Sequence, residues 1–233
     1  MQNGPDLEAL NTGSAAEVID RVLGDAADKH VCFTCSFQAE DVIVLDLLRK
    51  RMPEIPVLFL ETGYHFAETY EFRDRLAKDW KLNLVNVVPG KTVREQETAF
   101  GILYRDEPTK CCQLRKVEPL QRALEPYDVW FTGLRREQSV TRKNLKKVEL
   151  HRTPAGKTLT KVSPLARWTT KDVWYYAKGH DIPLLPLYEE GYTSIGCQPC
   201  TTLPIDPADL RSGRWSGQRV ECGLHAESFV DSR

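Results

Sequence analysis

Two close pairs of cysteines are the residues in this sequence best suited to metal chemistry. Cys111 and Cys112 are adjacent in "KCCQLRK", and Cys197 and Cys200 form a C-x-x-C in "GCQPC". A C-x-x-C spacing is common in chelating and redox sites. Vicinal thiols rarely form a relaxed disulfide with each other, but they can bind different atoms of a polynuclear centre. Four thiolates suit a tetrahedral zinc ion or an iron–sulfur cluster; the vicinal pair favours the cluster and leaves zinc open.

Two basic residues follow the vicinal pair at helical spacing. Lys116 lies four residues after Cys112, and Arg115 lies four residues after Cys111. In a helix each cation would share a face with its cysteine. Because four thiolates give an iron–sulfur centre a net negative charge, we expect Lys116 to lie beside it. The alternative is an ordinary cation on a helix surface.

A further cysteine, Cys222, stands alone in "RVECGLHAES" near the C-terminus. A catalytic thiol must be accessible, and nearby positive charge must favour its thiolate. Glycines at 213, 217 and 223 suggest a flexible segment, 205–233. The basic residues close to Cys222 in the sequence are Arg211, Arg214, Arg219 and His225. We interpret Cys222 as a candidate nucleophile on a mobile tail; the alternative is an incidental exposed cysteine.

The bulk composition describes an ordinary globular domain. The chain has 233 residues, of which 41% are hydrophobic, and this is enough to bury a substantial core. We see no repeat, low-complexity tract or linker, and therefore expect a single domain over 1–233. A net charge of −1, from 32 basic and 33 acidic side chains, argues against a general nucleic-acid or membrane-surface binder.

The sequence also favours a cytoplasmic protein. No stretch approaches the ~20 apolar residues that span a bilayer. The N-terminal "MQNGPDLEALNTGSAAE" lacks the basic and apolar regions of a signal peptide. In a reducing compartment, cysteines serve metal ligation or catalysis more often than structural disulfides.

Apolar runs alternate with amphipathic segments through the first half of the chain. We predict strands over 31–35, 56–60, 83–88 and 128–133, and helices over 15–29, 40–51, 66–80, 92–103 and 112–125. This alternation predicts an α/β fold, an open and mostly parallel twisted sheet with helices on both faces. A hairpin follows at 150–165 around Ala155-Gly156, and then a helix over 169–180 capped by Thr169 or Thr170.

The first predicted strand carries the two remaining cysteines, Cys32 and Cys35, in "VCFTC". An extended strand points residues three apart to opposite faces. They are therefore poorly placed to share a ligand, and we expect both to be buried core residues.

Several motifs in this order resemble the iron–sulfur-containing adenylyl-sulfate (APS) reductases of the sulfonucleotide reductase family. They are "CCQLRKV", "TGLRREQSVTR", "YTSIGCQPCT", "RSGRW" and "ECGLH". The resemblance covers nearly the whole chain. The related 3′-phospho (PAPS) reductases generally lack both cysteine pairs and keep the C-terminal cysteine motif. Because both pairs are present here, the resemblance favours APS as substrate.

The resemblance implies an adenine nucleotide alpha-hydrolase-like fold, in which ligand binds at the carboxyl ends of the strands. The turns there hold the implied nucleotide contacts Ser36, Thr62, Gly63 and Gly133. This sequence departs from the family pattern at Gln38-Ala39, where serine and glycine are more usual, and at "LETG", where "LDTG" is more usual. The sequence leaves two roles open for His65, a contact with ligand or packing.

The chemistry implied by the resemblance runs in two half-reactions. The Cys222 thiolate attacks the sulfur of APS and gives S-sulfocysteine and AMP. Reduced thioredoxin or glutaredoxin then releases sulfite, as in assimilatory sulfate reduction. The implied phosphosulfate contacts are Lys116, Arg142, Arg211, Arg214 and His225, and the implied ligands of a [4Fe–4S] cluster are Cys111, Cys112, Cys197 and Cys200.

Three other functions are weighed against this one. A PAPS reductase would use the basic run 135–147 to hold a 3′-phosphate. A cluster-binding redox regulator would use Cys222 as a sensor and bind no adenylate. A tRNA-thiolating relative would need an "SGGxDS" loop, which the sequence does not contain.

Overall fold

A six-stranded sheet in the order β3-β2-β1-β4-β6-β5 forms the centre of the fold. All neighbouring strands are parallel except β5, which pairs antiparallel with β6 at one edge. The strands are β1 (Val31–Thr34), β2 (Pro56–Leu60), β3 (Asn83–Val87), β4 (Val129–Phe131), β5 (Val148–Arg152) and β6 (Thr158–Val162). The predicted open, mostly parallel sheet is confirmed, and so is the hairpin, whose turn contains Gly156 at φ 89°.

The computed structural model describes residues 10–206, 208–215, 221 and 223–224. Cys222 and His225 lie outside these described residues, as does most of the segment after 215. The predicted mobile tail, 205–233, is therefore described only in part.

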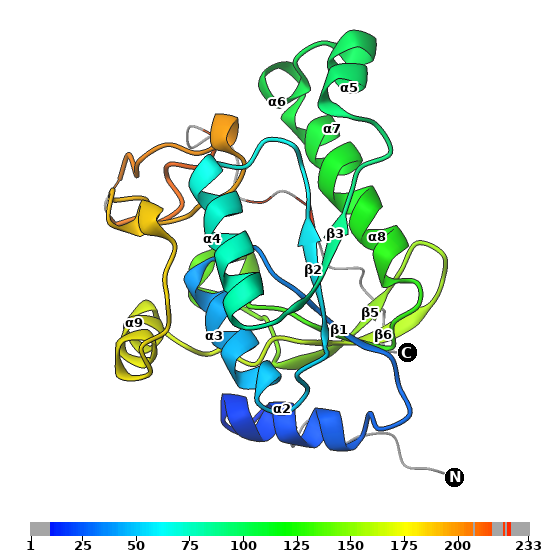
Figure 1. Cartoon of the computed structure of the whole chain (residues 1–233), viewed down its shortest axis with the longest axis vertical. Coiled ribbons are helices and arrows are strands. Elements are labelled where there is room, and N and C mark those ends of the chain that lie inside the picture. The colour runs from blue at the N-terminus through cyan, green and yellow to red at the C-terminus, as the bar shows by residue number, and fades with distance from the viewer. Residues whose placement is uncertain (1–9, 207, 216–220, 222, 225–233) are drawn as a thin grey trace.

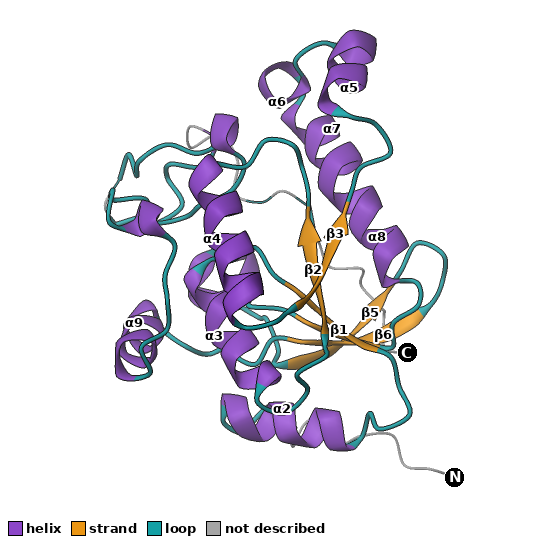
Figure 2. Cartoon of the chain, in the orientation of Figure 1, coloured by secondary structure: helices purple, strands orange, loops and turns teal. Residues whose placement is uncertain are grey.

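Helices cover both faces of the sheet, as predicted (Figures 1 and 2). In Figure 1, α2, α3 and α4 lie on one side of β1 and β2, and α8 lies on the other. The helices are α2 (Ala15–Gly24), α3 (Ala39–Arg49), α4 (Ala67–Asp79), α5 (Val93–Phe100), α6 (Leu103–Asp106), α7 (Pro108–Cys112), α8 (Glu118–Leu124) and α9 (Thr170–Gly179).

The central strands are apolar on both faces because both faces are covered. Val31 and Phe33 of β1 pack into the larger core with α2, α3 and α4, whereas Cys32 packs into the smaller core beneath α8. Cys35 belongs to the larger core. The prediction that Cys32 and Cys35 are buried on opposite faces is confirmed.

Local sequence signals account for the start of several helices. A capping box opens α2 at Ser14 and Glu17, another opens α5 at Thr92 and Glu95, and a third opens α9. In α9 the N-cap is Thr169, whose side chain accepts a hydrogen bond from the Asp172 amide. Of the two predicted caps, Thr169 is therefore the correct one.

The helix predicted over 112–125 differs from the structure. It begins earlier, at Pro108, and consists of α7, a π-helical turn η1 (Gln113–Val117) and α8. A π-turn closes its hydrogen bond one residue later than an α-turn, and such turns are frequent at functional sites. The helix predicted over 92–103 ends at Phe100, because Gly101 takes a φ of 72° there.

In the part of the chain that the structure describes, no helix has the length and apolar character needed to cross a membrane.

We predict that Cys32→Ser lowers the free energy of unfolding by about 1 to 3 kcal/mol, because it places a hydroxyl in an apolar core. Urea denaturation monitored by tryptophan fluorescence measures this change. Cys32→Ala is the matched control; it introduces no polar atom and should cost less. A serine variant as stable as the wild type would show that position 32 is not sealed from polar partners.

Candidate active site

A cavity of about 190 Å³ opens at the carboxyl ends of β1, β2 and β4. The strand order changes direction at β1, which has β2 on one side and β4 on the other. Loops that leave neighbouring strands toward opposite sides at such a point leave space for a ligand. Thr34, Leu60 and Thr132 mark the three strand ends in the cavity wall.

The loop after β1 is organised by Asp41 in the first turn of α3. The amide and the hydroxyl of Ser36 donate to Asp41 Oδ2 at 2.6 and 2.5 Å. Burial raises the pKa of Asp41 to about 6, although the hydrogen bonds from Ser36 act in the opposite direction. Phe37 turns at φ 60° and buries its ring in the core. The predicted nucleotide contact Ser36 therefore lines the cavity with its polar groups already held by Asp41.

Gln38, the departure from the family pattern, ties this loop to the segment that carries the C-x-x-C. Its Oε1 accepts from the amide of Ile195 at 2.9 Å, and its Nε2 donates to Ser36 Oγ at 3.2 Å. A glycine or serine at this position would be too short to make both contacts.

The loop after β4 approaches the same carboxylate. At Gly133 an added Cβ would lie 3.0 Å from the Asp41 amide nitrogen and closer still to its Oδ1. The predicted site residue Gly133 therefore allows two strand-end loops to meet at the cavity wall.

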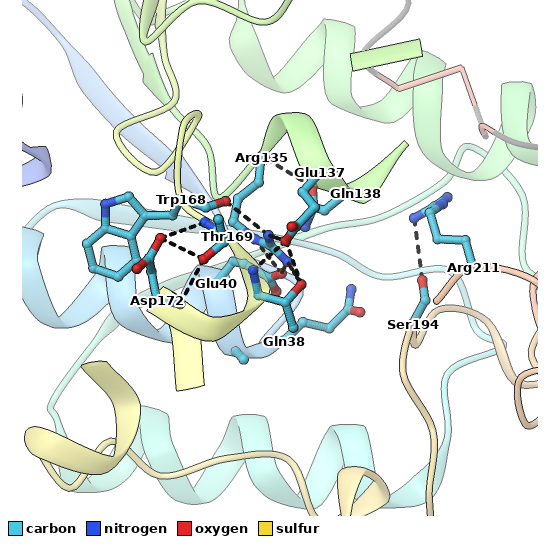
Figure 3. A network of polar contacts seen from close by, with 12 residues as sticks. Gln38, Glu40, Arg135, Glu137, Gln138, Trp168, Thr169, Asp172, Ser194 and Arg211 are labelled. Carbon is cyan, nitrogen blue, oxygen red and sulfur yellow. Dashed lines mark hydrogen bonds and ion pairs between the residues drawn. The ribbon is translucent and has the colours of Figure 1, made fainter. Parts of the chain in front are cut away.

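Arg135, next along this loop, is held by carboxylates from two elements (Figure 3). Its Nε and Nη2 donate to Glu40 Oε1 at 2.9 and 2.7 Å, and its Nη1 donates to Glu137 Oε2 at 3.1 Å. The side chain is only 4% exposed. The sequence does not predict the pairing with Glu40, because Glu40 lies 95 residues before Arg135 in the chain.

The other cavity cations come from later segments of the chain. Arg142 pairs with Glu221 through Nε at 2.8 Å. Arg211 Nη1 donates to Ser194 Oγ at 3.4 Å, on the side of the site away from Arg135 in Figure 3. Arg214 is buried over the Trp215 ring, and its Nε donates to the carbonyl of Cys200 at 3.2 Å. Together with Lys116, all the described phosphosulfate candidates line one cavity.

A second, smaller cavity lies beside the first and is lined by Cys111, Cys112, Cys197 and Cys200. Burial and the neighbouring thiols raise the pKa of Cys111 to about 12, and burial and Cys197 raise that of Cys200 to about 11. Four thiolates so close together would repel one another unless a positively charged group neutralised them. Among the described residues, no group of three or more His, Cys, Asp or Glu side chains is arranged to hold a metal ion.

Residues lining both cavities connect the thiols to the larger cavity. Lys116, Arg214 and Trp215 are part of both walls. The sequence spacing predicts Lys116 one α-helical turn from Cys112, whereas in the structure Lys116 lies within the π-turn η1 that follows Cys112. Lys116 still reaches both cavities.

Arg115 has a role that the sequence analysis did not identify. It is 3% exposed, and its Nε donates to the Thr62 carbonyl. Its Nη1 donates to the Lys91 carbonyl at 3.2 Å and to Gln96 Oε1 at 3.1 Å. Arg115 therefore clamps the loops after β2 and β3 to the thiol-bearing helix. The helical spacing of Arg115 from Cys111 does not predict these partners, because they lie far away in the sequence.

The predicted contacts in the turn after β2, Thr62 and Gly63, are not among the described residues that line the larger cavity. Thr62 lines the thiol cavity, with Oγ1 3.3 Å from Cys197 Sγ. Gly63, at φ 73°, is not among the described residues that line either cavity. His65 lines the larger cavity, where its Nε2 lies 2.9 Å from the Leu60 carbonyl, and burial lowers its pKa to about 4.

Residues 30–203 match the sequence profile of the phosphoadenosine phosphosulfate reductase domain. The chain belongs to this family. Among curated relatives, it is 42% identical over 217 residues to the adenosine 5′-phosphosulfate reductase of Geobacillus thermodenitrificans, covering 92% of this chain and 91% of that protein. It is 45% identical over 199 residues to the enzyme of that name from Mycobacterium tuberculosis, covering 83% of this chain and 77% of that protein. The resemblance to APS reductases is confirmed.

Several solved structures share the fold. A phosphoadenylyl-sulfate reductase from Candida auris superposes with a TM-score of 0.73 at 24% identity, over 87% of this chain and 99% of that one. An FMN adenylyltransferase from Candida glabrata superposes with a TM-score of 0.64 at 14% identity, over 88% of this chain and 70% of that one. These likenesses confirm the predicted adenine nucleotide alpha-hydrolase-like fold.

We predict that Gly133→Ala lowers the free energy of unfolding by about 1 to 3 kcal/mol, because the new methyl group overlaps Asp41. Thermal or urea denaturation measures the loss. Gly24→Ala is the matched control, since an added Cβ at Gly24 meets no heavy atom of the described residues within 4 Å. Equal stability of both variants would mean that the loops after β1 and β4 separate without cost.

Proposed function

We propose that this chain reduces adenylyl sulfate to sulfite and AMP in sulfate assimilation, with Cys222 as nucleophile and a thioredoxin or glutaredoxin as reductant. The observation that carries the proposal is the identity of 42% to an adenosine 5′-phosphosulfate reductase over 92% of the chain. The cation-lined cavity at the carboxyl ends of the strands supports it.

The reaction consists of two half-reactions. The Cys222 thiolate forms a bond to the sulfur of adenylyl sulfate as the bond from sulfur to the phosphate oxygen breaks, so that AMP leaves and Cys222 carries a sulfonate. A thiolate of the reductant then attacks Cys222 Sγ and displaces sulfite. The second thiol of the reductant resolves the mixed disulfide, and the reductant leaves with one disulfide, oxidised by two electrons.

The cavity cations offset the repulsion between two anions. A thiolate and a sulfate about 4 Å apart repel by roughly 4 kcal/mol at an effective dielectric constant of ~20. Lys116, Arg142, Arg211 and Arg214 line the cavity, and we assign them to the phosphosulfate, together with His225. Arginine suits this task because its planar donors match phosphate and sulfate oxygens.

The thiol cavity fits an iron–sulfur group. Its donors are the four thiols that line it, and cysteine thiolates are the usual ligands of iron–sulfur clusters. In a [4Fe–4S] cluster each thiolate binds a different iron, so the thiolates need not converge on one atom. Cys111, Cys112, Cys197 and Cys200 would hold the cluster. When bound, it would cross-link α7 to the C-x-x-C segment and contribute to the electrostatics at Lys116.

The basic run 135–147 does not favour the PAPS alternative. Arg135 is paired with Glu40 and Glu137, Arg136 Nε donates to the Leu145 carbonyl at 2.7 Å, and Lys147 donates to the Gly13 carbonyl. These three of the six basic residues in the run therefore bind partners within the chain, whereas Lys143 and Lys146 are exposed. Support for adenylyl sulfate as the substrate comes from the two cysteine pairs and from the curated relatives named adenosine 5′-phosphosulfate reductase.

We further propose that the chain acts as one domain over 1–233, with 205–233 as a catalytic tail that serves substrate and reductant in turn. The described cysteines are all free, which suits a reducing compartment. We therefore place the reaction in the cytoplasm.

The nucleophile is tested by mass spectrometry of the enzyme mixed with adenylyl sulfate and no reductant. We expect a sulfonate adduct on the peptide containing "VECGLH", with release of AMP, and no adduct in Cys222→Ser. Cys222→Ser should keep the iron content of the wild type. A wild-type protein that never becomes sulfonated at Cys222 would refute the proposal.

The cluster is tested by iron analysis and visible absorption of Cys111→Ser and Cys200→Ser. Each substitution removes a thiolate ligand, so we expect loss of iron and of the brown colour. Cys32→Ala is the matched control and should keep both, because Cys32 lies in the core beneath α8. Full iron content in either serine variant would contradict the assigned ligands.

A further inference from the structure

Glu221, the residue before Cys222, contacts two residues of the loop after β4. Its Oε1 accepts from Arg142 Nε at 2.8 Å, and its Oε2 accepts from Arg142 Nη2 at 2.8 Å. The Thr141 hydroxyl also donates to Oε1, at 3.1 Å. Two parallel bonds between a guanidinium and a carboxylate fix orientation as well as distance.

The pair lies in a partly buried position. The side chain of Arg142 is 11% exposed and that of Glu221 is 23% exposed. Hydrogen bonding and the charge of Arg142 lower the pKa of Glu221 in spite of its burial. The Glu221 carboxylate is therefore ionised at neutral pH, and the partial burial of the pair reduces its screening by salt.

Arg142 also has donors to spare for the cavity that it lines. A guanidinium has five N–H groups. Glu221 takes one on Nε and one on Nη2, and Gln138 Oε1 takes one on Nη1 at 2.5 Å. The other two N–H groups of Arg142 have no hydrogen-bond acceptor among the described residues. Gln138 in turn accepts from the Arg135 amide at 3.0 Å, so Arg142 is anchored to the loop after β4.

The described residues on the other side of Cys222 are also fixed. Gly223 takes a φ of 87°, and Leu224 packs against the core cluster beneath α8 and lines the cavity. Glu221 thus makes a polar contact and Leu224 an apolar contact with residues that line the cavity.

We propose that Glu221 is a positioning residue for the reaction. Its carboxylate docks the C-terminal segment on Arg142, so that one guanidinium holds both the neighbour of the nucleophile and the anionic group of the substrate. This inference rests on the proposed role of Cys222 as nucleophile. Its consequence is kinetic: Glu221 contributes to the rate of sulfur transfer within the bound complex and little to substrate binding.

The test is single-turnover sulfonation of Cys222 by adenylyl sulfate, followed by rapid quenching and mass spectrometry, in the iron-loaded full chain. Glu221→Gln keeps the shape but loses the charge. We expect the rate at saturating substrate to fall about 10- to 100-fold, as misplacement of a reacting group does. The half-saturating concentration should stay within about 3-fold of the wild type.

Glu221→Asp keeps the charge on a shorter side chain, and we expect a rate between those of the wild type and Glu221→Gln. Glu190→Gln is the matched control; it removes a carboxylate from an exposed position and should leave the rate unchanged. Circular dichroism checks that each variant folds. If Glu221→Gln does not fold, the aspartate variant alone decides, and a wild-type rate in it overturns the proposal.

Two further outcomes overturn the positioning role. An unchanged rate with tighter half-saturation would make Glu221 an internal anion that competes with substrate for Arg142. An unchanged rate and unchanged half-saturation would make the pair merely structural. If the wild type is sulfonated, either outcome refutes only this inference; if the wild type is not sulfonated, the proposed function fails first.

Discussion

The reversal of strand order at β1 is the constraint on which the site depends. β1 pairs with β2 on one side and β4 on the other, so their following loops diverge and leave the cavity between them. Where the loops after β1 and β4 meet again, Asp41 and Gly133 are in close approach. Sheet pairing and the buried Asp41 therefore hold the strand ends and the loops after β1 and β4. Residues after β4 supply much of the remaining lining of the cavity.

The described residues of the segment 186–215 form no long helix or strand, and individual contacts hold them in place. His65 pairs with Cys197 in an isolated antiparallel β-bridge, and the Gln198 amide donates to the Tyr64 carbonyl at 2.7 Å. Gly196 leaves room for Arg214, because an added Cβ would lie 2.6 Å from Arg214 Cζ. These contacts bring the C-x-x-C beside the vicinal pair on α7. The thiol cavity is thus a junction between the turn after β2, the thiol-bearing helix and the late segment.

The sequence predicted what depends on short-range patterns. The four parallel strands, the hairpin, the Thr169 cap and the burial of Cys32 and Cys35 follow from apolar runs, turn residues and side-chain alternation. It did not predict the π-turn after Cys112, the buried clamp at Arg115, or the pairs of Arg135 with Glu40 and Arg142 with Glu221. Each of these depends on partners that only the tertiary fold brings together, and no local pattern in one sequence encodes them. The positions of Cys222 and His225 lie beyond the described residues, so their roles stay predictions.

The cavity cations share a property that bears on catalysis. Arg142 is held by Gln138 and Glu221, and Arg214 by the Cys200 carbonyl and the Trp215 ring. An arginine whose orientation is already fixed needs little reorganisation free energy when charge develops beside it. A mobile surface lysine must first lose conformational entropy. The partners that fix these arginines are one carboxylate and several neutral acceptors, so the wall keeps a net positive charge. Because Lys116 and Arg214 belong to both walls, any charge placed among the thiols acts on the same cations that face the larger cavity. The two cavities therefore form a single electrostatic unit, and the geometry of one constrains the chemistry of the other.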